Sequence, residues 1–190
     1  MAKEVEIKFQ IADLRALTQA LKRAGFQQIT RSTREINLLY DLPGQRLRKQ
    51  GQLLRLRKFG EQWVLTHKSK SKAGRHKVRV EIETRVENGE AMGAILRALG
   101  YTPTLRYEKY RAEWSDGAGH VVLDETPIGN FGEIEGTPRW IDRTARALGV
   151  KSSDYITQTY ADLFFGWKRK TRSQASEMTF RAVGGQGRQP

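Results

Sequence analysis

The chain has 190 residues, enough for one sizeable domain with a hydrophobic core, and 38% of them are hydrophobic. It contains no cysteine, which excludes disulfides and thiolate-bound zinc or iron–sulfur centres. No apolar run approaches the roughly 20 residues that cross a bilayer, and the first residues lack the apolar stretch of a signal peptide, so we expect a cytoplasmic protein without a membrane span. The formal net charge of +13 predicts a negatively charged partner: nucleic acid, anionic lipid or a phosphorylated metabolite.

Four segments space their apolar residues as amphipathic helices do. They cover residues 12–25, 88–100, 138–149 and 153–164. The first two end at Gly25 and Gly100, where glycine favours the left-handed conformation that closes a helix. The third has Pro138 in its first turn, where a proline costs no hydrogen bond. We expect these helices to cover the apolar face of a sheet.

Short segments between the helices alternate charged and apolar residues, as strands do when their two faces differ. They cover residues 4–9, 54–57, 63–68, 78–83, 109–114, 121–124 and 133–135. An antiparallel sheet with its charged face in water would explain this alternation. However, the charged positions are almost purely ionic and set bases beside acids, and the helices are available to cover the apolar faces. These observations favour a closed barrel whose charged faces line a lumen.

A charged lumen restricts what the protein can bind. Buried charges must be paired, hydrogen-bonded or metal-bound, because removing them from water is costly. We therefore expect arginine–carboxylate pairs across neighbouring strands when the lumen is empty. A polyphosphate with a divalent cation would use both kinds of charge, since bases hold phosphate oxygens and carboxylates hold the metal. Hard oxygen donors without thiolates indicate Mg²⁺ or Mn²⁺ as the cofactor.

The last residues of the chain have a different composition. Residues 167–190 hold six basic residues and one acidic residue, and they end in a glycine-rich stretch. Such a composition buries too little surface to fold alone. We expect a domain over residues 1–166, followed by a basic and flexible tail over 167–190 that is dispensable for catalysis.

The alternating segments, in this order, resemble the motifs of the CYTH, or triphosphate tunnel metalloenzyme, superfamily. The first of them matches the Glu-x-Glu-x-Lys signature of that superfamily, and the resemblance covers about residues 3–165. The matching segments are Glu4-Val5-Glu6-Ile7-Lys8-Phe9, Leu54-Arg55-Leu56-Arg57, Leu65-Thr66-His67-Lys68, Arg79-Val80-Glu81-Ile82-Glu83, Glu108-Lys109-Tyr110-Arg111 and residues 123–135.

The resemblance implies an α+β fold: a closed eight-stranded antiparallel β-barrel, or tunnel, with a charged lumen and helices packed outside. It also implies an enzyme that holds a triphosphate and divalent metal inside. The residues that it assigns to triphosphate binding are Lys8, Arg55, Arg57, Lys68, Arg79, Lys109 and Arg111, and among these Lys8, Arg57, Lys68, Lys109 and Arg111 are assigned to catalysis. The carboxylates that it assigns to the metal are Glu4, Glu6, Glu81, Glu83, Asp124, Glu133 and Glu135.

Within the superfamily, residues 100–135 most resemble the class IV adenylyl cyclase branch, which implies conversion of ATP to cyclic AMP and pyrophosphate. The alternative is a triphosphatase that hydrolyses tripolyphosphate, thiamine triphosphate or a nucleoside triphosphate. An RNA-binding module has less support, because carboxylates among the lysines repel phosphates unless a metal intervenes. A protein that senses a triphosphate without catalysis stays open, and so does a homodimer.

Overall fold

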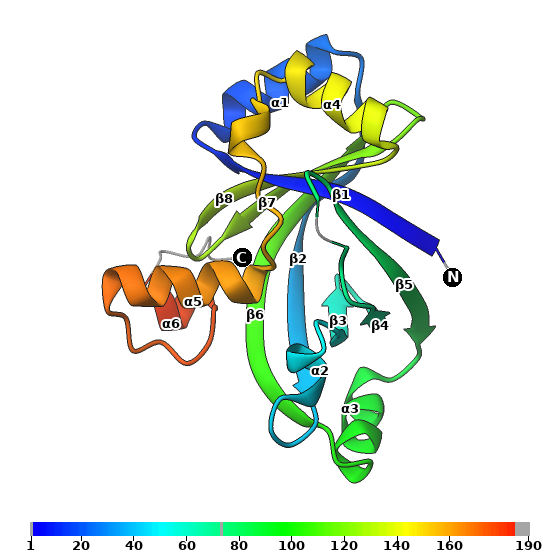
Figure 1. Cartoon of the computed structure of the whole chain (residues 1–190), viewed down its shortest axis with the longest axis vertical. Coiled ribbons are helices and arrows are strands. Elements are labelled where there is room, and N and C mark those ends of the chain that lie inside the picture. The colour runs from blue at the N-terminus through cyan, green and yellow to red at the C-terminus, as the bar shows by residue number, and fades with distance from the viewer. Residues whose placement is uncertain (1, 73, 185–190) are drawn as a thin grey trace.

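The computed structural model describes residues 2–72 and 74–184. It contains eight strands, which join in the order β1-β5-β4-β3-β2-β6-β7-β8 as one closed antiparallel barrel (Figure 1). The strands are β1 (Ala2–Ile11), β2 (Gln27–Asp41), β3 (Leu53–Phe59), β4 (Gln62–Lys68), β5 (Lys77–Val86), β6 (Thr102–Ser115), β7 (His120–Thr126) and β8 (Gly129–Glu135). The predicted closed eight-stranded barrel with helices outside is confirmed.

The first strand closes the barrel. Its N-terminal half pairs with β5, where Glu4 lies opposite Arg79, and its C-terminal half pairs with β8, where Lys8 lies opposite Glu133. Because side chains alternate along a strand, this register sends Glu4 and Lys8 into the lumen and Ile7 into the outer core, where Ile7 is fully buried.

The helices pack on the outside of the barrel. They are α1 (Leu14–Arg23), α2 (Arg46–Lys49), α3 (Gly89–Ala98), α4 (Pro138–Ala147), α5 (Tyr160–Thr171) and α6 (Phe180–Val183), together with the 3₁₀ turn η1 (Ser152–Asp154). Asp13 caps α1 by accepting hydrogen bonds from the backbone N–H groups of Arg15 and Ala16. Three of the four predicted helices thus lie where the sequence indicates, as α1, α3 and α4.

The predicted helix over residues 153–164 is wrong in its position. Thr159 and Asp162 form a capping box, each side chain accepting a backbone N–H from the other residue. This box starts α5 at Tyr160 and leaves Ile156 free to bridge to Lys8 of β1. The apolar spacing was therefore real, but the helix begins later and continues to Thr171.

The helices cover only part of the barrel. α1 and α4 lie together across one side, over a core that contains Ile7, Ile134 and Trp140 (Figure 1). On the outer face of β5, by contrast, Val80 and Ile82 remain 39% and 50% exposed. The expectation that helices cover every apolar strand face is thus met only in part.

The C-terminal segment packs against the barrel as far as the structure describes it. Met178 is fully buried, its N–H donates to the carbonyl of Arg106, and its carbonyl accepts from the N–H of Glu108. The N–H of Phe180 donates to the Glu108 carboxylate at 2.8 Å. Residues 167–184 therefore pack against the outside of the barrel, where we expected a flexible tail. Their few apolar residues are widely spaced and meet partners far away in the sequence, while residues 185–190 lie outside the described part.

Candidate functional site

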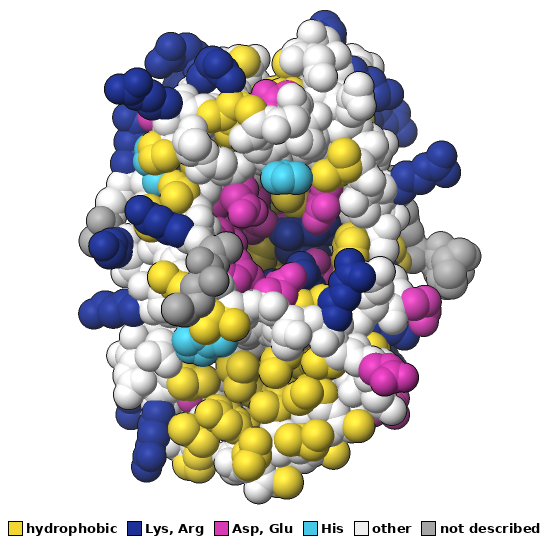
Figure 2. All heavy atoms as spheres, turned by 90° about the vertical axis from the view of Figure 1, so that its right-hand side faces the viewer, with side chains coloured by type: hydrophobic (Ala, Val, Ile, Leu, Met, Phe, Trp, Pro, Cys, Tyr) yellow, Lys and Arg dark blue, Asp and Glu magenta, His cyan; other side chains and the backbone are white. Residues whose placement is uncertain are grey.

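The strands enclose a cavity of about 590 Å³, and Figure 2 shows its opening. Acidic side chains ring the opening, and basic side chains lie deeper (Figure 2). Every predicted phosphate-binding residue lines the cavity, and so does every predicted metal ligand except Asp124. These lining residues are Glu4, Glu6, Lys8, Arg55, Arg57, Lys68, Arg79, Glu81, Glu83, Lys109, Arg111, Glu133 and Glu135. The charged faces thus share one lumen, which rules out the open sheet.

Asp124 lies inside the barrel below the open cavity, paired with Arg111 in the strand register, and joins two of the basic residues. It is fully buried and accepts hydrogen bonds from Lys109 Nζ at 2.9 Å and from Arg111 Nε at 2.8 Å. Burial alone would lower the pKa of Arg111, but Asp124 and Glu133 hold that pKa well above its ordinary value. Because its oxygens are engaged with these cations, Asp124 is placed to orient Lys109 and Arg111. Such arginine–carboxylate pairs across strands confirm that the empty lumen balances part of its own charge.

A second buried carboxylate, Glu35, lies under the same basic residues and was missed from the sequence. Its oxygens are 3.4 Å from Lys109 Nζ, 3.7 Å from Arg57 and 3.9 Å from Arg111. Burial would raise the pKa of Glu35, but these cations hold it well below its usual range. Glu35 therefore stays ionised and fixes the basic side chains in place.

Tyr160, the first residue of α5, also reaches the lumen. The ammonium groups of Lys8 and Lys109 lie 4.2 Å and 4.6 Å from the centre of its ring, at distances typical of cation–π contacts. Lys8 in turn donates a hydrogen bond to Glu133, which also accepts one from Arg111. The lysines are thus held by an aromatic face as well as by carboxylates.

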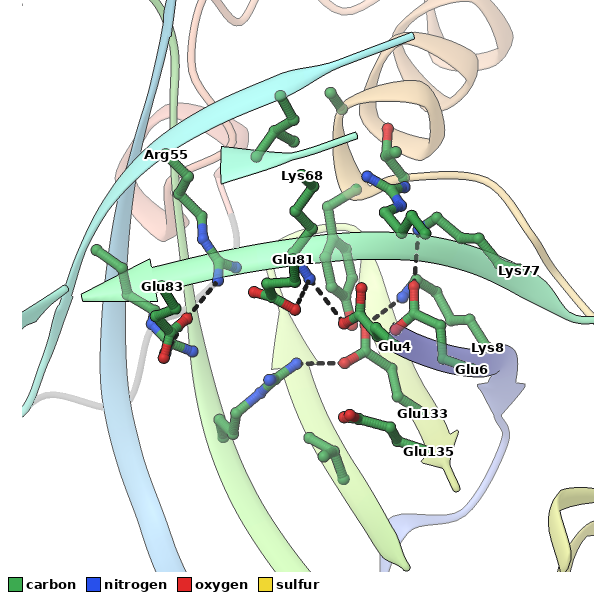
Figure 3. A pocket seen from close by; sticks show the side chains of 18 of the residues that line it. Glu4, Glu6, Lys8, Arg55, Lys68, Lys77, Glu81, Glu83, Glu133 and Glu135 are labelled. Atoms are coloured by element: carbon green, nitrogen blue, oxygen red, sulfur yellow. Dashed lines mark hydrogen bonds and ion pairs between the residues drawn. The ribbon is translucent and has the colours of Figure 1, made fainter. Parts of the chain in front are cut away.

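Four acids from β1, β5 and β8 gather at the opening (Figure 3). We call these the mouth carboxylates: Glu4, Glu6, Glu81 and Glu135. Lys68 Nζ lies 2.7 Å from Glu4 and 3.1 Å from Glu81, and Lys77 Nζ lies 2.7 Å from Glu6. Two ammonium groups therefore share four acids, which leaves an excess of negative charge at the mouth.

This crowding of charges shifts the pKa values of the acids. Partial burial, together with the charges of Glu4 and Glu6, raises the pKa of Glu135 to about 7. Burial and Glu6 likewise raise the pKa of Glu4. For Glu6 itself, burial and Glu133 act in the same direction, but Lys77 and Lys8 outweigh them and lower its pKa to about 2. With a pKa of about 7, Glu135 keeps a proton in part at neutral pH.

The donors at the mouth fit a divalent cation. Within residues 2–72 and 74–184, no three acid or histidine side chains already surround a common point. However, Glu4 Oε2 is buried without a hydrogen-bond partner, and none of the ion pairs in this part of the chain includes Glu135. A divalent cation in place of the Glu135 proton would bind both Glu4 Oε2 and the Glu135 carboxylate. Carboxylate oxygens are the ligands that Mg²⁺ and Mn²⁺ prefer.

Three arginines line the same cavity: Arg55 and Arg57 on β3, and Arg79 on β5, next to Glu4 of β1 in the strand register. Arg57 lies 3.3 Å from Glu83 and Arg55 lies 3.9 Å from it, so the two share one partly exposed acid. Burial and the neighbouring Arg55 lower the pKa of Arg57. Arg79 is only 6% exposed, its Nε has no hydrogen-bond partner, and no ion pair among the described residues includes it. A buried cation without an ion pair favours the binding of an anion next to it.

Sequence reasoning missed three residues of the lumen, each for a local reason. Glu35 lies in β2, where Thr33, Glu35 and Asn37 alternate with Arg34 and Ile36, a pattern that could have found it. Lys77 lies one residue before the predicted strand over residues 78–83, on the same face of β5 as Arg79. No strand alternation marks Tyr160, because the position at which α5 begins aims its side chain into the barrel.

A closed barrel that holds both bases and crowded carboxylates in its lumen is the architecture that the sequence resemblance implies. The comparison with known families agrees, because the CYTH domain matches residues 2–160, and the chain belongs to this family. No helix in the described part of the chain is both long and apolar enough to cross a membrane.

Two curated relatives and one solved structure are similar to this chain. A Methanocaldococcus jannaschii protein whose name proposes an adenylate cyclase is 27% identical over 171 residues, which cover 84% of this chain and 97% of that protein. The adenylate cyclase CyaB of Aeromonas hydrophila is 25% identical over 175 residues, covering 84% and 87%. A Hippeastrum protein, proposed to be an adenylyl cyclase and described as having a dominant triphosphatase activity, superposes with a TM-score of 0.64 at 20% identity, covering 86% and 95%.

Proposed function

We propose that this protein is a metal-dependent enzyme that binds a triphosphate in its tunnel and converts ATP to cyclic AMP and pyrophosphate. The observation that carries the proposal is that one cavity holds both a buried base without an ion pair, Arg79, and the crowded mouth carboxylates. An inorganic polyphosphate chain with a divalent cation would neutralise both. The similarity to proteins named as adenylate cyclases supports the nucleotide reaction.

In this proposal the basic residues hold the phosphate oxygens and neutralise the charge that grows on them during phosphoryl transfer. They are Lys8, Arg55, Arg57, Lys68, Arg79, Lys109 and Arg111. Asp124 and Glu35 keep Lys109 and Arg111 extended toward the substrate, so that these groups need no rearrangement when the charge develops.

The mouth carboxylates would hold Mg²⁺ or Mn²⁺, with Glu83 and Glu133 next to them. A bound divalent cation supplies Lewis-acid polarisation of the phosphoryl oxygens and orients them. The walls then fix the triphosphate so that the ribose 3′-hydroxyl can attack the α-phosphorus in line with the departing pyrophosphate.

A triphosphatase is the second candidate, because the similar Hippeastrum protein is described as dominantly a triphosphatase. The same residues would hold the phosphates, while water would attack a terminal phosphorus. A non-catalytic sensor would bind the same ligands without turnover.

The test incubates the purified protein with ATP and Mg²⁺ or Mn²⁺, and separately with tripolyphosphate, and identifies the products. Cyclic AMP with pyrophosphate supports the cyclase. Orthophosphate from either substrate, without cyclic AMP, supports the triphosphatase. Metal-dependent thermal stabilisation by tripolyphosphate without any product would indicate a sensor, and binding of an RNA oligonucleotide without metal would contradict the tunnel proposal.

A further inference from the structure

A second cavity of about 260 Å³ lies beside the tunnel. It is built from the end of β2, the short helix α2, the start of β3 and of β6, and the beginning of α5. The two cavities share part of their walls. The residues that line both are Leu39, Leu53, Arg79, Thr159 and Ala161. These shared residues place the second cavity directly beside the tunnel, with Arg79 bordering both.

The walls of the second cavity suit a flat and uncharged group. Leu39, Leu53 and Leu105 supply apolar surface, and Phe165 adds an aromatic face with the Arg48 guanidinium 4.8 Å from its ring centre. Guanidinium and aromatic planes are the surfaces on which nucleobases stack. The polar groups on the same walls are amides and hydroxyls, which can hydrogen-bond to a base or a ribose. They belong to Gln45, Gln52, Ser71, Thr104, Thr157 and Thr159.

The acids of this cavity are already engaged. Asp41 accepts hydrogen bonds from the backbone N–H groups of Leu42, Leu47 and Arg48. Asp162 accepts from the N–H and the hydroxyl of Thr159 in the capping box of α5. The charges of the second cavity that lack an internal partner are therefore positive. Positive charges disfavour the binding of a cationic group such as thiazolium, so the cavity suits a neutral base better.

Arg79 stands at the junction of the two cavities. It is 6% exposed and without an ion pair in the described part of the chain, and its Nε has no hydrogen-bond partner. A phosphate that directly follows the neutral group would supply the missing counter-charge at this point.

We propose that the second cavity binds the nucleoside of a nucleoside triphosphate, with the base against Arg48 and Phe165 and the first phosphate at Arg79. This inference rests on the proposed function and deepens it, because it makes a nucleotide the substrate in preference to tripolyphosphate. It also orients the substrate: the ribose lies at the junction, and the remaining phosphates point into the tunnel toward Lys109 and Arg111.

The test compares two ligands that share the triphosphate and differ in the nucleoside. Affinities for tripolyphosphate and for the α,β-methylene analogue of ATP, in which the bond that a cyclase breaks is blocked, are measured by calorimetry with Mg²⁺ on the full chain. We expect Arg48→Ala and Phe165→Leu to raise the ratio of the dissociation constant for the analogue to that for tripolyphosphate by about tenfold, the scale of one lost stacking contact. Arg46→Ala is the matched control, because Arg46 lies on the same helix, is exposed and does not line the cavity.

The outcomes separate this inference from the proposed function. An unchanged ratio in Arg48→Ala and Phe165→Leu, or the same rise in Arg46→Ala, would overturn the nucleoside site and leave the triphosphate tunnel standing. Tripolyphosphate binding without any binding of the ATP analogue by the unmodified protein would do the same. Binding of neither ligand would overturn the tunnel proposal together with this one. Arg48 is exposed, so Arg48→Ala decides the matter even if Phe165→Leu does not fold.

Discussion

The hydroxyl of Tyr160 donates a hydrogen bond of 2.5 Å to Asp124, so that a helix outside the barrel is tied to a fully buried carboxylate inside it. The ring of the same tyrosine meets Lys8 and Lys109. The start of α5 therefore helps to fix the charges of the tunnel.

Tyr160→Phe should keep the ring and its contacts but lose the hydrogen bond. Because Asp124 retains Lys109 and Arg111, we expect the free energy of unfolding to fall by about 1 kcal/mol, the net value of one hydrogen bond. Urea denaturation measures this change. Tyr101→Phe, at a partly buried position in a different cluster, is the control. Equal stability of the two variants would show that the bond to Asp124 contributes nothing.

Glu135 should make the metal-free protein less stable as the pH rises. Its pKa is raised from 4.5 to about 7 in the folded protein, so between these values the folded state binds a proton that the unfolded state has released. This contribution to stability is complete below the lower value and is lost as the pH rises through the upper one. The acids whose pKa is lowered, such as Glu6 at about 2, titrate below this window.

Thermal unfolding from about pH 5 to about pH 8, without divalent metal, measures this dependence. We expect Glu135→Gln to flatten the decline and to be more stable than the unmodified protein at the alkaline end. Mn²⁺ should stabilise Glu135→Gln less than the unmodified protein, because a ligand is lost. A decline of the same slope in both proteins would contradict the crowding of the mouth carboxylates.

Arg57→Ala should weaken tripolyphosphate binding about tenfold or more, since a charge-assisted contact in a partly buried site is lost. Its side chain is 16% exposed, and it shares its acids with other bases, so the fold should tolerate the change. Calorimetry with Mg²⁺ measures the affinity. Glu61→Ala, which removes a side chain that is 94% exposed, should leave the affinity unchanged. Equal affinities in the two variants would remove Arg57 from the phosphate site.

Lys109→Ala should act mainly on stability. Its ammonium group is 1% exposed and lies between Asp124 and Glu35. Removing it leaves two buried carboxylates with less counter-charge, which costs about 3–5 kcal/mol of unfolding free energy. Denaturant unfolding compared with Lys58→Ala, which loses a surface pair, tests this expectation. A loss as small as that of Lys58→Ala would mean that the two acids do not need Lys109.

Met178→Ala should destabilise the protein by about 2–5 kcal/mol, as large-to-small changes in a core do. Ser176→Ala changes an exposed neighbour and should have little effect. A chain that ends at Gly166 should lose at least as much stability as Met178→Ala, because it also loses Trp167 and Val183 from the same cluster. Denaturant unfolding that is unchanged in all three would restore the interpretation of this segment as a flexible tail.

The lumen could be predicted where the sequence alternates strictly. Over residues 4–8 of β1 and throughout β5, every second residue is charged. A strand offers only two faces, so Glu6 and Glu81 had to share a side with the charged residues two positions away. The strand β2 was harder, because its register against β6 shifts between Gln28 and Thr30 and again between Thr30 and Thr33. These irregularities disturb the start of the strand, whereas Glu35 lies in the regular stretch that follows, where its alternation with Arg34 and Ile36 could have found it.

Contacts set by distant partners could not be predicted from local patterns. Phe180 and Met178 lie in a segment without periodicity, and their positions depend on Glu108 and Arg106 of β6. The second cavity has the same origin. Arg48 and Phe165 are far apart in the sequence, and only the closed barrel brings their planes together.

The seam between β1 and β8 has a consequence for how the protein is made. Lys8 and Glu133 are 125 residues apart, so at a synthesis rate of about 5–20 residues per second the first strand waits on the order of ten seconds for its partner. An unpaired strand can form backbone hydrogen bonds with the strands of other chains and so start aggregation. Charged side chains oppose this pairing. One face of the waiting strand carries Glu4, Glu6 and Lys8, which water solvates well. The same charges that are costly to bury in the finished tunnel therefore protect the nascent chain from aggregation until the barrel can close.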